Sequence, residues 1–186
     1  MRGKTKVIYL TGVMILMSGM LGSAVLAQEK LKRVVSVTGA GLVQLYEEEV
    51  NLGDAVFRGA IGLEFEKVTS PSSGTYIVPA ISFGRRQLGV TTTLGLKNYF
   101  KPTAPEGLWW GVYLTGGLGA DWGPAKDWGV SVSTVGGGIN LGYRYLLPKN
   151  FTGEWSFGAI YLFRSGKDIE VSGIGPKIEV KFGYAF

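Results

Sequence analysis

Apolar and polar side chains alternate along most of the chain after its first 27 residues. In AVFRGAIGLEFEKV, residues 55–68, alternate positions carry mostly large apolar side chains, and the positions between them carry small residues, arginine and glutamate. A two-residue period is that of a β-strand with one apolar and one polar face. No apolar repeat of 3.6 residues in this part of the chain is long enough to predict a helix. The chain is therefore predicted to be all-β.

The alternating pattern occurs in eight segments, separated by stretches that are rich in turn-forming or charged residues. SPSSG, KPTAPEG and LPKNFTG contain the glycine, proline, serine and asparagine that favour turns. Short connections between successive strands indicate antiparallel pairing in an up-and-down order. The predicted strands are residues 33–46, 55–68, 75–85, 88–100, 108–120, 130–146, 154–164 and 174–186.

Two of these segments depart from a regular strand pattern. Pro79 lies inside the third segment, although proline has no N–H to donate to a neighbouring strand. In the sixth segment, Val132 falls on one phase of the alternation and Val135 falls on the other. We expect a bulge near Thr134, or a strand that begins after it.

The start of the chain has the pattern of a secretory signal peptide. Three basic residues precede a mainly apolar stretch, residues 7–27, in which the small residues Val25 and Ala27 occupy the −3 and −1 positions of a cleavage site. A retained membrane anchor is the alternative, but the glycine and serine near the end of the stretch favour cleavage. We expect residues 1–27 to be the signal peptide and residues 28–186 to be the exported domain.

Charge and composition exclude several kinds of function. The formal net charge is +5, and loss of the three basic residues of the leader lowers it to +2, which is too small to indicate nucleic-acid binding. The chain contains neither cysteine nor histidine. Disulfides, thiolate metal sites, thiol catalysis and histidine-based catalytic triads are therefore excluded.

Alternation alone does not say which face of a barrel lies inside. The positions opposite the apolar faces carry mainly glycine, alanine, serine and threonine with a few charges, which suits the narrow interior of an eight-stranded barrel. A face exposed to water would be richer in lysine and glutamate, so we expect side chains such as Phe57, Leu63, Leu96 and Phe157 to face lipid. The charged residues expected inside the barrel are Arg58, Glu64, Glu66, Lys97, Glu154, Arg164, Glu179 and Lys181.

Aromatic residues gather near one set of strand ends, beside the turns at 70–74, 101–107 and 147–153 and near residue 186. Such rings favour the boundary between hydrocarbon and lipid headgroups, so they are predicted to form a belt on the outside of the barrel. The residues of this predicted belt are Tyr76, Phe100, Trp109, Trp110, Tyr145, Trp155, Tyr184 and Phe186.

The final segment, KIEVKFGYAF, carries an apolar or aromatic residue at every second position. Together with the export signal and the eight alternating segments, it resembles the small outer-membrane β-barrels of the OmpA-like and OmpX-like superfamily, over essentially the whole exported domain. The resemblance implies an eight-stranded antiparallel up-and-down transmembrane β-barrel in the outer membrane of a Gram-negative cell. It also implies that the barrel-insertion machinery reads the last strand as an assembly signal, through Ile178, Val180, Phe182, Tyr184 and Phe186.

For function, the sequence favours a non-enzymatic outer-membrane protein that contributes to envelope structure or to surface interaction. Outer-membrane enzymes that modify lipid A, and outer-membrane proteases, depend on a catalytic histidine that this chain lacks. Glu64 and Glu66 lie two positions apart on one strand face, which does not by itself indicate acid–base chemistry. We expect no catalytic residue, cofactor or metal site. We expect a monomer whose partners are outer-membrane lipid and the insertion machinery, and not nucleic acid.

Two other functions are compatible with the same pattern. Interior charges that pair with one another would plug the barrel, whereas charges lining an open path would suit a narrow channel or transporter for ions or small solutes. A soluble secreted lipocalin-like barrel that binds a ligand would alternate in the same way, with its apolar face inside. The pairing of the charges separates the first two functions, and the facing of the strands separates a membrane barrel from a soluble one.

Overall fold

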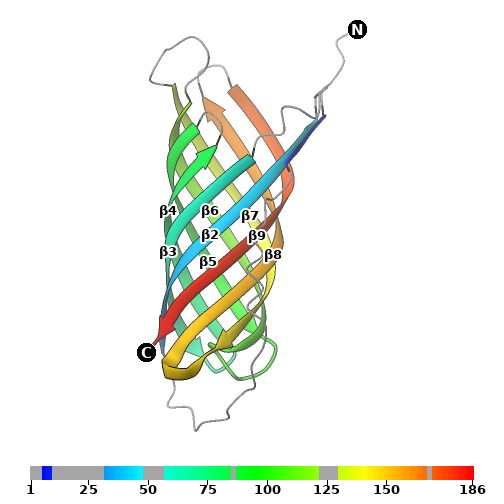
Figure 1. The fold of residues 1–186 in the computed structure, drawn as a ribbon. Helices are drawn as coiled ribbons and strands as arrows, with labels where there is room; N and C mark the ends of the chain where they lie inside the picture. Colours follow the sequence, from blue (N-terminus) through cyan, green and yellow to red (C-terminus); the bar gives the residue numbers. More distant parts are fainter. Residues whose placement is uncertain (1–5, 10–31, 48–56, 85–86, 122–129, 167–168) are drawn as a thin grey trace.

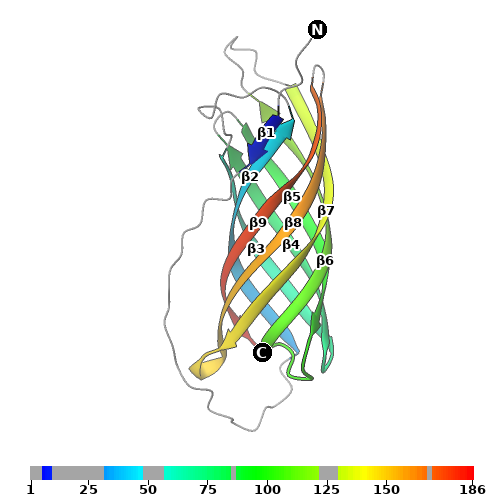
Figure 2. The ribbon, with the colours of Figure 1, turned by 90° about the vertical axis from the view of Figure 1, so that its right-hand side faces the viewer.

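The computed structural model describes residues 6–9, 32–47, 57–84, 87–121, 130–166 and 169–186, and eight long strands form a closed barrel (Figures 1 and 2). A short strand, β1 (Lys6–Tyr9), pairs with the last part of β2. It belongs to the segment predicted to be a signal peptide, whose cleavage stays a prediction. The barrel strands are β2 (Arg33–Glu47), β3 (Phe57–Ser70), β4 (Ser73–Gly84), β5 (Gln87–Tyr99), β6 (Gly107–Asp121), β7 (Val130–Leu146), β8 (Phe151–Gly166) and β9 (Ile169–Ala185).

Each barrel strand pairs antiparallel with its neighbours in sequence, and the last strand pairs with the first. The closing ladder between β2 and β9 runs from the pair Val34–Ala185 to the pair Leu42–Lys177. At its end, the Phe186 N–H donates to the carbonyl of Arg33 at 2.9 Å. Closure leaves β2 and β9 without an open edge along this ladder. The predicted all-β, eight-stranded, antiparallel up-and-down barrel is confirmed.

The predicted bulge near Thr134 is wrong. Strand β7 keeps one continuous register against both β6 and β8. Val132 is only 1% exposed and faces the barrel interior, whereas Val135 is 61% exposed and faces outward. The alternation of side-chain direction is therefore regular, and only the chemical type of the inward residue changes along the strand.

Pro79 lies within β4, and the neighbouring ladder accommodates it. On one side Pro79 pairs with Thr92 of β5. On the other side, pairs with β3 occur in the same register before and after the proline, at Phe65–Ile77 and Gly62–Ala80, but not at Pro79 itself. This local gap follows from the missing N–H of proline.

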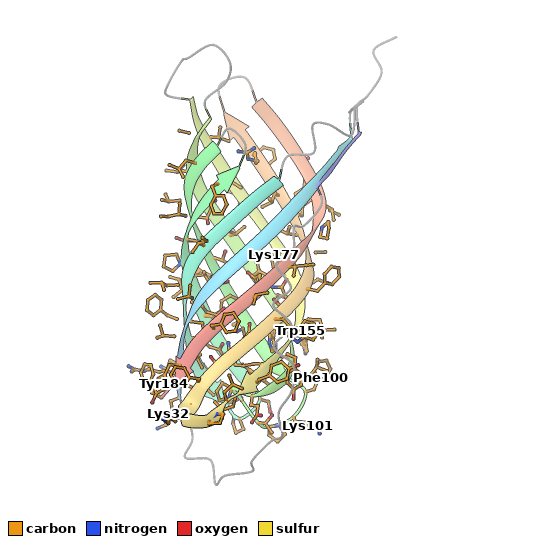
Figure 3. The ribbon with its side chains drawn as sticks, viewed as in Figure 1. Lys32, Phe100, Lys101, Trp155, Lys177 and Tyr184 are labelled. Carbon is orange, nitrogen blue, oxygen red and sulfur yellow. The ribbon has the colours of Figure 1, made fainter. Side chains whose placement is uncertain are left out.

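The outer surface of the barrel is apolar and the interior contains charged side chains. Along β3, Leu63 is 46% exposed and Phe65 is also exposed, whereas Glu64 is 0% exposed and Glu66 is buried. The same contrast holds around the barrel, because large apolar side chains on every strand from β2 to β9 point outward (Figure 3). In the described residues, no helix has the length and the apolar composition needed to cross a lipid bilayer.

Glycines on the inner face make room for large interior side chains. A Cβ atom built at Gly95 would overlap the ring of Tyr76, and one built at Gly142 would lie 2.7 Å from the Trp109 ring. Both aromatic rings are buried. The small residues of the polar faces therefore set how closely the wall approaches the interior aromatic rings.

Gly95→Ala is expected to lower the free energy of unfolding by about 1–3 kcal/mol, because the added methyl group overpacks Tyr76. Gly39→Ala is the matched control, since nothing lies within 4 Å of a Cβ at that position. It should leave stability unchanged or raise it slightly. Urea unfolding of the refolded chain, followed by tryptophan fluorescence, measures both, and equal effects of the two substitutions would contradict the packing argument.

Candidate functional site

Six charged side chains from five strands meet inside the barrel and form what we call the charge cluster. All six are almost completely buried. They alternate along their strands with side chains that point outward, so each reaches the interior because of its phase in the strand. The charge cluster consists of Glu64 and Glu66 from β3, Lys97 from β5, Arg144 from β7, Glu154 from β8 and Lys181 from β9.

The Lys97 ammonium group lies among the three carboxylates of the charge cluster. Its Nζ atom is 2.8 Å from Glu64 Oε1, 2.9 Å from Glu66 Oε2 and 2.9 Å from Glu154 Oε2. Oxygens of these carboxylates lie within 4.8 Å of one another, a spacing that could hold a metal ion. Here a cation of the chain itself lies among them and donates hydrogen bonds to all three.

Arg144 contacts the same three carboxylates from β7. Its Nη2 atom is 3.0 Å from Glu64 Oε1 and 2.8 Å from Glu66 Oε2, and it also pairs with Glu154. Its Nη1 atom donates to the Tyr99 hydroxyl at 3.2 Å, and that hydroxyl donates to Glu66 at 3.0 Å. Sequence analysis did not place Arg144 in the interior. The signal was present, because Arg144 lies between Tyr143 and Tyr145 on the phase opposite the apolar face.

Lys181 connects the charge cluster to a second pair of charges. Its Nζ atom is 2.5 Å from Glu64 Oε2, 3.0 Å from Glu154 Oε1 and 3.5 Å from Glu179 Oε2. Glu179 also pairs with Lys177 at 2.8 Å. The Asn140 amide and the Ser156 hydroxyl donate hydrogen bonds to Glu179 at 3.0 and 3.2 Å. Lys177 is another interior charge that sequence analysis missed.

Aromatic rings surround the buried cations. Lys97 Nζ lies 4.7 Å from the centroid of the Trp109 ring and 5.2 Å from that of Tyr76. Lys177 Nζ lies 4.0 Å from the centroid of the Tyr113 ring. These distances are typical of cation–π contacts, which are strengthened when the cation is shielded from water.

The prediction of an outer aromatic belt is therefore wrong for two of its members. Trp109 is 0% exposed and Tyr76 is also buried, so both lie inside the barrel. The reason is strand phase, because Trp109 precedes Trp110, which is 46% exposed, and adjacent residues of a strand face opposite ways. The remaining residues of the predicted belt are exposed: Phe100, Trp110, Tyr145, Trp155, Tyr184 and Phe186.

The structure describes most of the other residues predicted as interior charges or as an assembly signal, and none of those contributes to the charge cluster. Arg164 is buried on β8 but makes no ion pair with a described residue. The backbone of Arg58 belongs to β3, and its side chain lies outside the described part of the structure. In the last strand, Phe182, Tyr184 and Phe186 are exposed, while Ile178 and Val180 are half-buried.

The arrangement is chemically suited to a rigid plug. Three carboxylates and three cations balance within the charge cluster, and each carboxylate contacts more than one cation. Buried charges are tolerated only when they are paired in this way. A carboxylate held by several cations is a poor proton donor and a poor base, so the geometry does not favour acid–base chemistry.

Lys97→Met is expected to lower the free energy of unfolding by about 3–5 kcal/mol, because it leaves buried carboxylates without their central cation. Lys101→Met, at an exposed lysine beyond β5, is the matched control and should change it by less than about 0.5 kcal/mol. Adding Glu66→Gln to Lys97→Met should recover part of the loss, since one uncompensated charge is removed. Urea unfolding measures all three variants, and a Lys97→Met barrel as stable as the control would refute the network.

Comparison with known proteins gives no family for this chain. It matches no protein-family model, and no similar protein was found among curated proteins or solved structures.

Proposed function

We propose that this chain is an integral β-barrel protein of the outer membrane that contributes to envelope structure or surface interaction without catalysing a reaction. The observation that carries the proposal is the sense of burial. Side chains such as Leu63, Leu96 and Phe157 are exposed on the outer wall, while Glu64 and Lys97 are buried. A lipid environment solvates such a wall, whereas water does not.

The extent of the apolar surface supports a membrane environment. Proteins in water rarely expose a contiguous apolar patch of more than a few hundred Å². On β6, exposed apolar side chains run from Leu108 through Trp110, Val112 and Leu114 to Leu118. That span matches the roughly 9–11 residues that a tilted strand needs to cross the hydrocarbon core.

A soluble lipocalin-like barrel is less well supported. Such a barrel buries its apolar faces around a ligand and exposes its polar faces to water. In this chain the interior around Lys97 consists largely of ion pairs. In water, a barrel with charges inside and leucine and phenylalanine outside would be unfavourable on both faces of its wall. The membrane assignment is therefore preferred.

The lower end of the barrel in Figure 3 has the character of a membrane–water boundary. Phe100, Trp155 and Tyr184 lie around this end, and Lys32 and Lys101 lie close to it. Aromatic rings and basic side chains favour the headgroup region. By the resemblance stated above, this end would face the periplasm, and the outward residues of β9 would be read by the insertion machinery.

A plugged barrel is preferred to a narrow channel. The charge cluster contains residues from β3, β5, β7, β8 and β9, so its ion pairs reach across the interior. The barrel also contains a cavity that is lined by Lys177 and Glu179 but by no residue of the charge cluster. Conduction would require paired charges to separate, which is costly away from water.

Tryptophan quenching by lipid tests the membrane assignment. We would prepare variants that keep one tryptophan, at position 109, 110 or 155, with phenylalanine at the other tryptophan positions. In vesicles of brominated phosphatidylcholine, emission from Trp110 and Trp155 should be strongly quenched because their rings face the acyl chains. Trp109 is the control, since it is the neighbour of Trp110 in sequence and is buried inside.

Recovery of the chain in the aqueous phase without detergent would refute the membrane assignment, as would quenching of Trp109 equal to that of Trp110. Fractionation of Gram-negative cells that produce the full chain tests the location separately. There we expect the chain in the outer-membrane fraction.

Planar-bilayer recording tests the plugged barrel. Wild-type protein should give no resolved conductance steps, because the charge cluster blocks the interior. A wide porin inserted in the same bilayer is the positive control. Well-resolved steps from the wild type would refute the plug, and a change in their ion selectivity in Lys97→Met would favour the channel instead.

A further inference from the structure

The half of the barrel beyond Lys177 and Glu179 contains a cavity of about 150 Å³. Figure 3 places Lys177 midway along the barrel, and the charge cluster lies on the side of the lower turns. All eight barrel strands contribute to the cavity wall, which is mostly small or apolar and includes Val78, Val132 and Leu162. A wall of this kind gives the cavity an apolar character that the charge cluster does not have.

One strand presents both apolar and cationic groups to this cavity. Ile160, Leu162 and Arg164 follow one another at alternate positions of β8, and all three are buried and line the cavity. Alternate residues of a strand face the same side. The cavity therefore has an apolar stretch that ends at a guanidinium group. Val132 and Thr134 of β7 continue the wall beside Arg164.

Arg164 has no acceptor among the described residues. The residue is only 6% exposed, and its Nε atom is buried without a hydrogen-bond partner among the described residues. The four buried carboxylates of the described interior already contact Lys97, Arg144, Lys177 or Lys181. Burying a guanidinium group without an anion is unfavourable, so Arg164 has hydrogen-bond donors available for an anionic ligand.

A second polar group of the cavity wall also lacks a partner. The hydroxyl of Thr38, on β2, is buried without a hydrogen bond and lines the same cavity. Thr38 pairs with Lys181 of β9, whereas Arg164 pairs with Val171 near the other end of the same strand. The Thr38 hydroxyl therefore lies far from the guanidinium and is not a contact of the anion that Arg164 would bind.

We propose that this cavity binds a small organic anion, namely a monocarboxylate with a short apolar chain. Its carboxylate pairs with the guanidinium of Arg164, and its chain packs against Leu162, Ile160 and Val132. The inference goes beyond the proposed function and does not depend on where the barrel resides.

Size and charge define this class of ligand. A cavity of about 150 Å³ is known to hold a molecule the size of benzene, which corresponds to a chain of about six carbons. A planar carboxylate matches the two parallel N–H groups of a guanidinium. A phosphate dianion would need a second free cation, but Lys177 is already paired with Glu179.

Titration with hexanoate tests the inference on the full chain, in lipid discs or in buffer if the protein proves soluble. Isothermal calorimetry should detect saturable binding of hexanoate. Both 1-hexanol, which lacks the carboxylate, and acetate, which lacks the apolar chain, should bind at least about tenfold more weakly. Arg164→Met should weaken hexanoate binding by at least about tenfold. Arg33→Met, at an exposed arginine of β2, is the matched control and should leave it unchanged.

Stability measurements keep the test valid if a variant folds differently. Hexanoate should raise the urea midpoint of the wild type and of Arg33→Met, but not that of Arg164→Met. Leu162→Trp, which fills the cavity, should also abolish the shift. The proposal is overturned if hexanoate does not bind, if Arg164→Met or Leu162→Trp binds it as the wild type does, or if 1-hexanol binds equally well. None of these results affects the membrane assignment.

Discussion

The rest of this barrel depends on the ion pairs between Lys97 and the carboxylates of Glu64, Glu66 and Glu154. These contacts join β5 to β3 and β8 through the interior, and each distance is below 3 Å. Since the charged faces of these strands meet inside, their apolar faces must point outward. The directions of all remaining side chains on these strands follow from the two-residue period. The buried network therefore fixes which residues form the outer surface of the barrel.

Most of the fold could be predicted from the sequence because a two-residue period is a strong local signal. The alternation predicted all eight long strands, and the bounds of β7, Val130–Leu146, match the prediction. Period alone gives the two faces of a strand but not which face is inside. That choice needs contacts between strands far apart in sequence, such as Lys97 with Glu154, which no local pattern contains.

The errors arose where chemical type was used in place of strand phase. The outer belt is predicted to include both Trp109 and Trp110 because both are aromatic and near a turn, yet their positions face opposite ways. Val132 suggested a bulge because it is apolar, although it lies on the inward phase. Arg144 is not among the predicted interior charges, although its phase in β7, between two tyrosines, places it inside. Side-chain direction in a strand is set by the backbone, so position along the strand predicts it and chemical type does not.

The interior is divided into a charged part and an apolar part, and this division bears on Arg164. The charge cluster is balanced without Arg164, so the cluster gives no reason for a further buried cation. Near Arg164 the wall is formed by apolar residues such as Leu162 and Val132, which could pack without a charge between them. Burying a charge without a partner costs free energy that an apolar side chain in the same place would not cost. An arginine at this position is thus better explained by something that it binds than by the stability of the barrel.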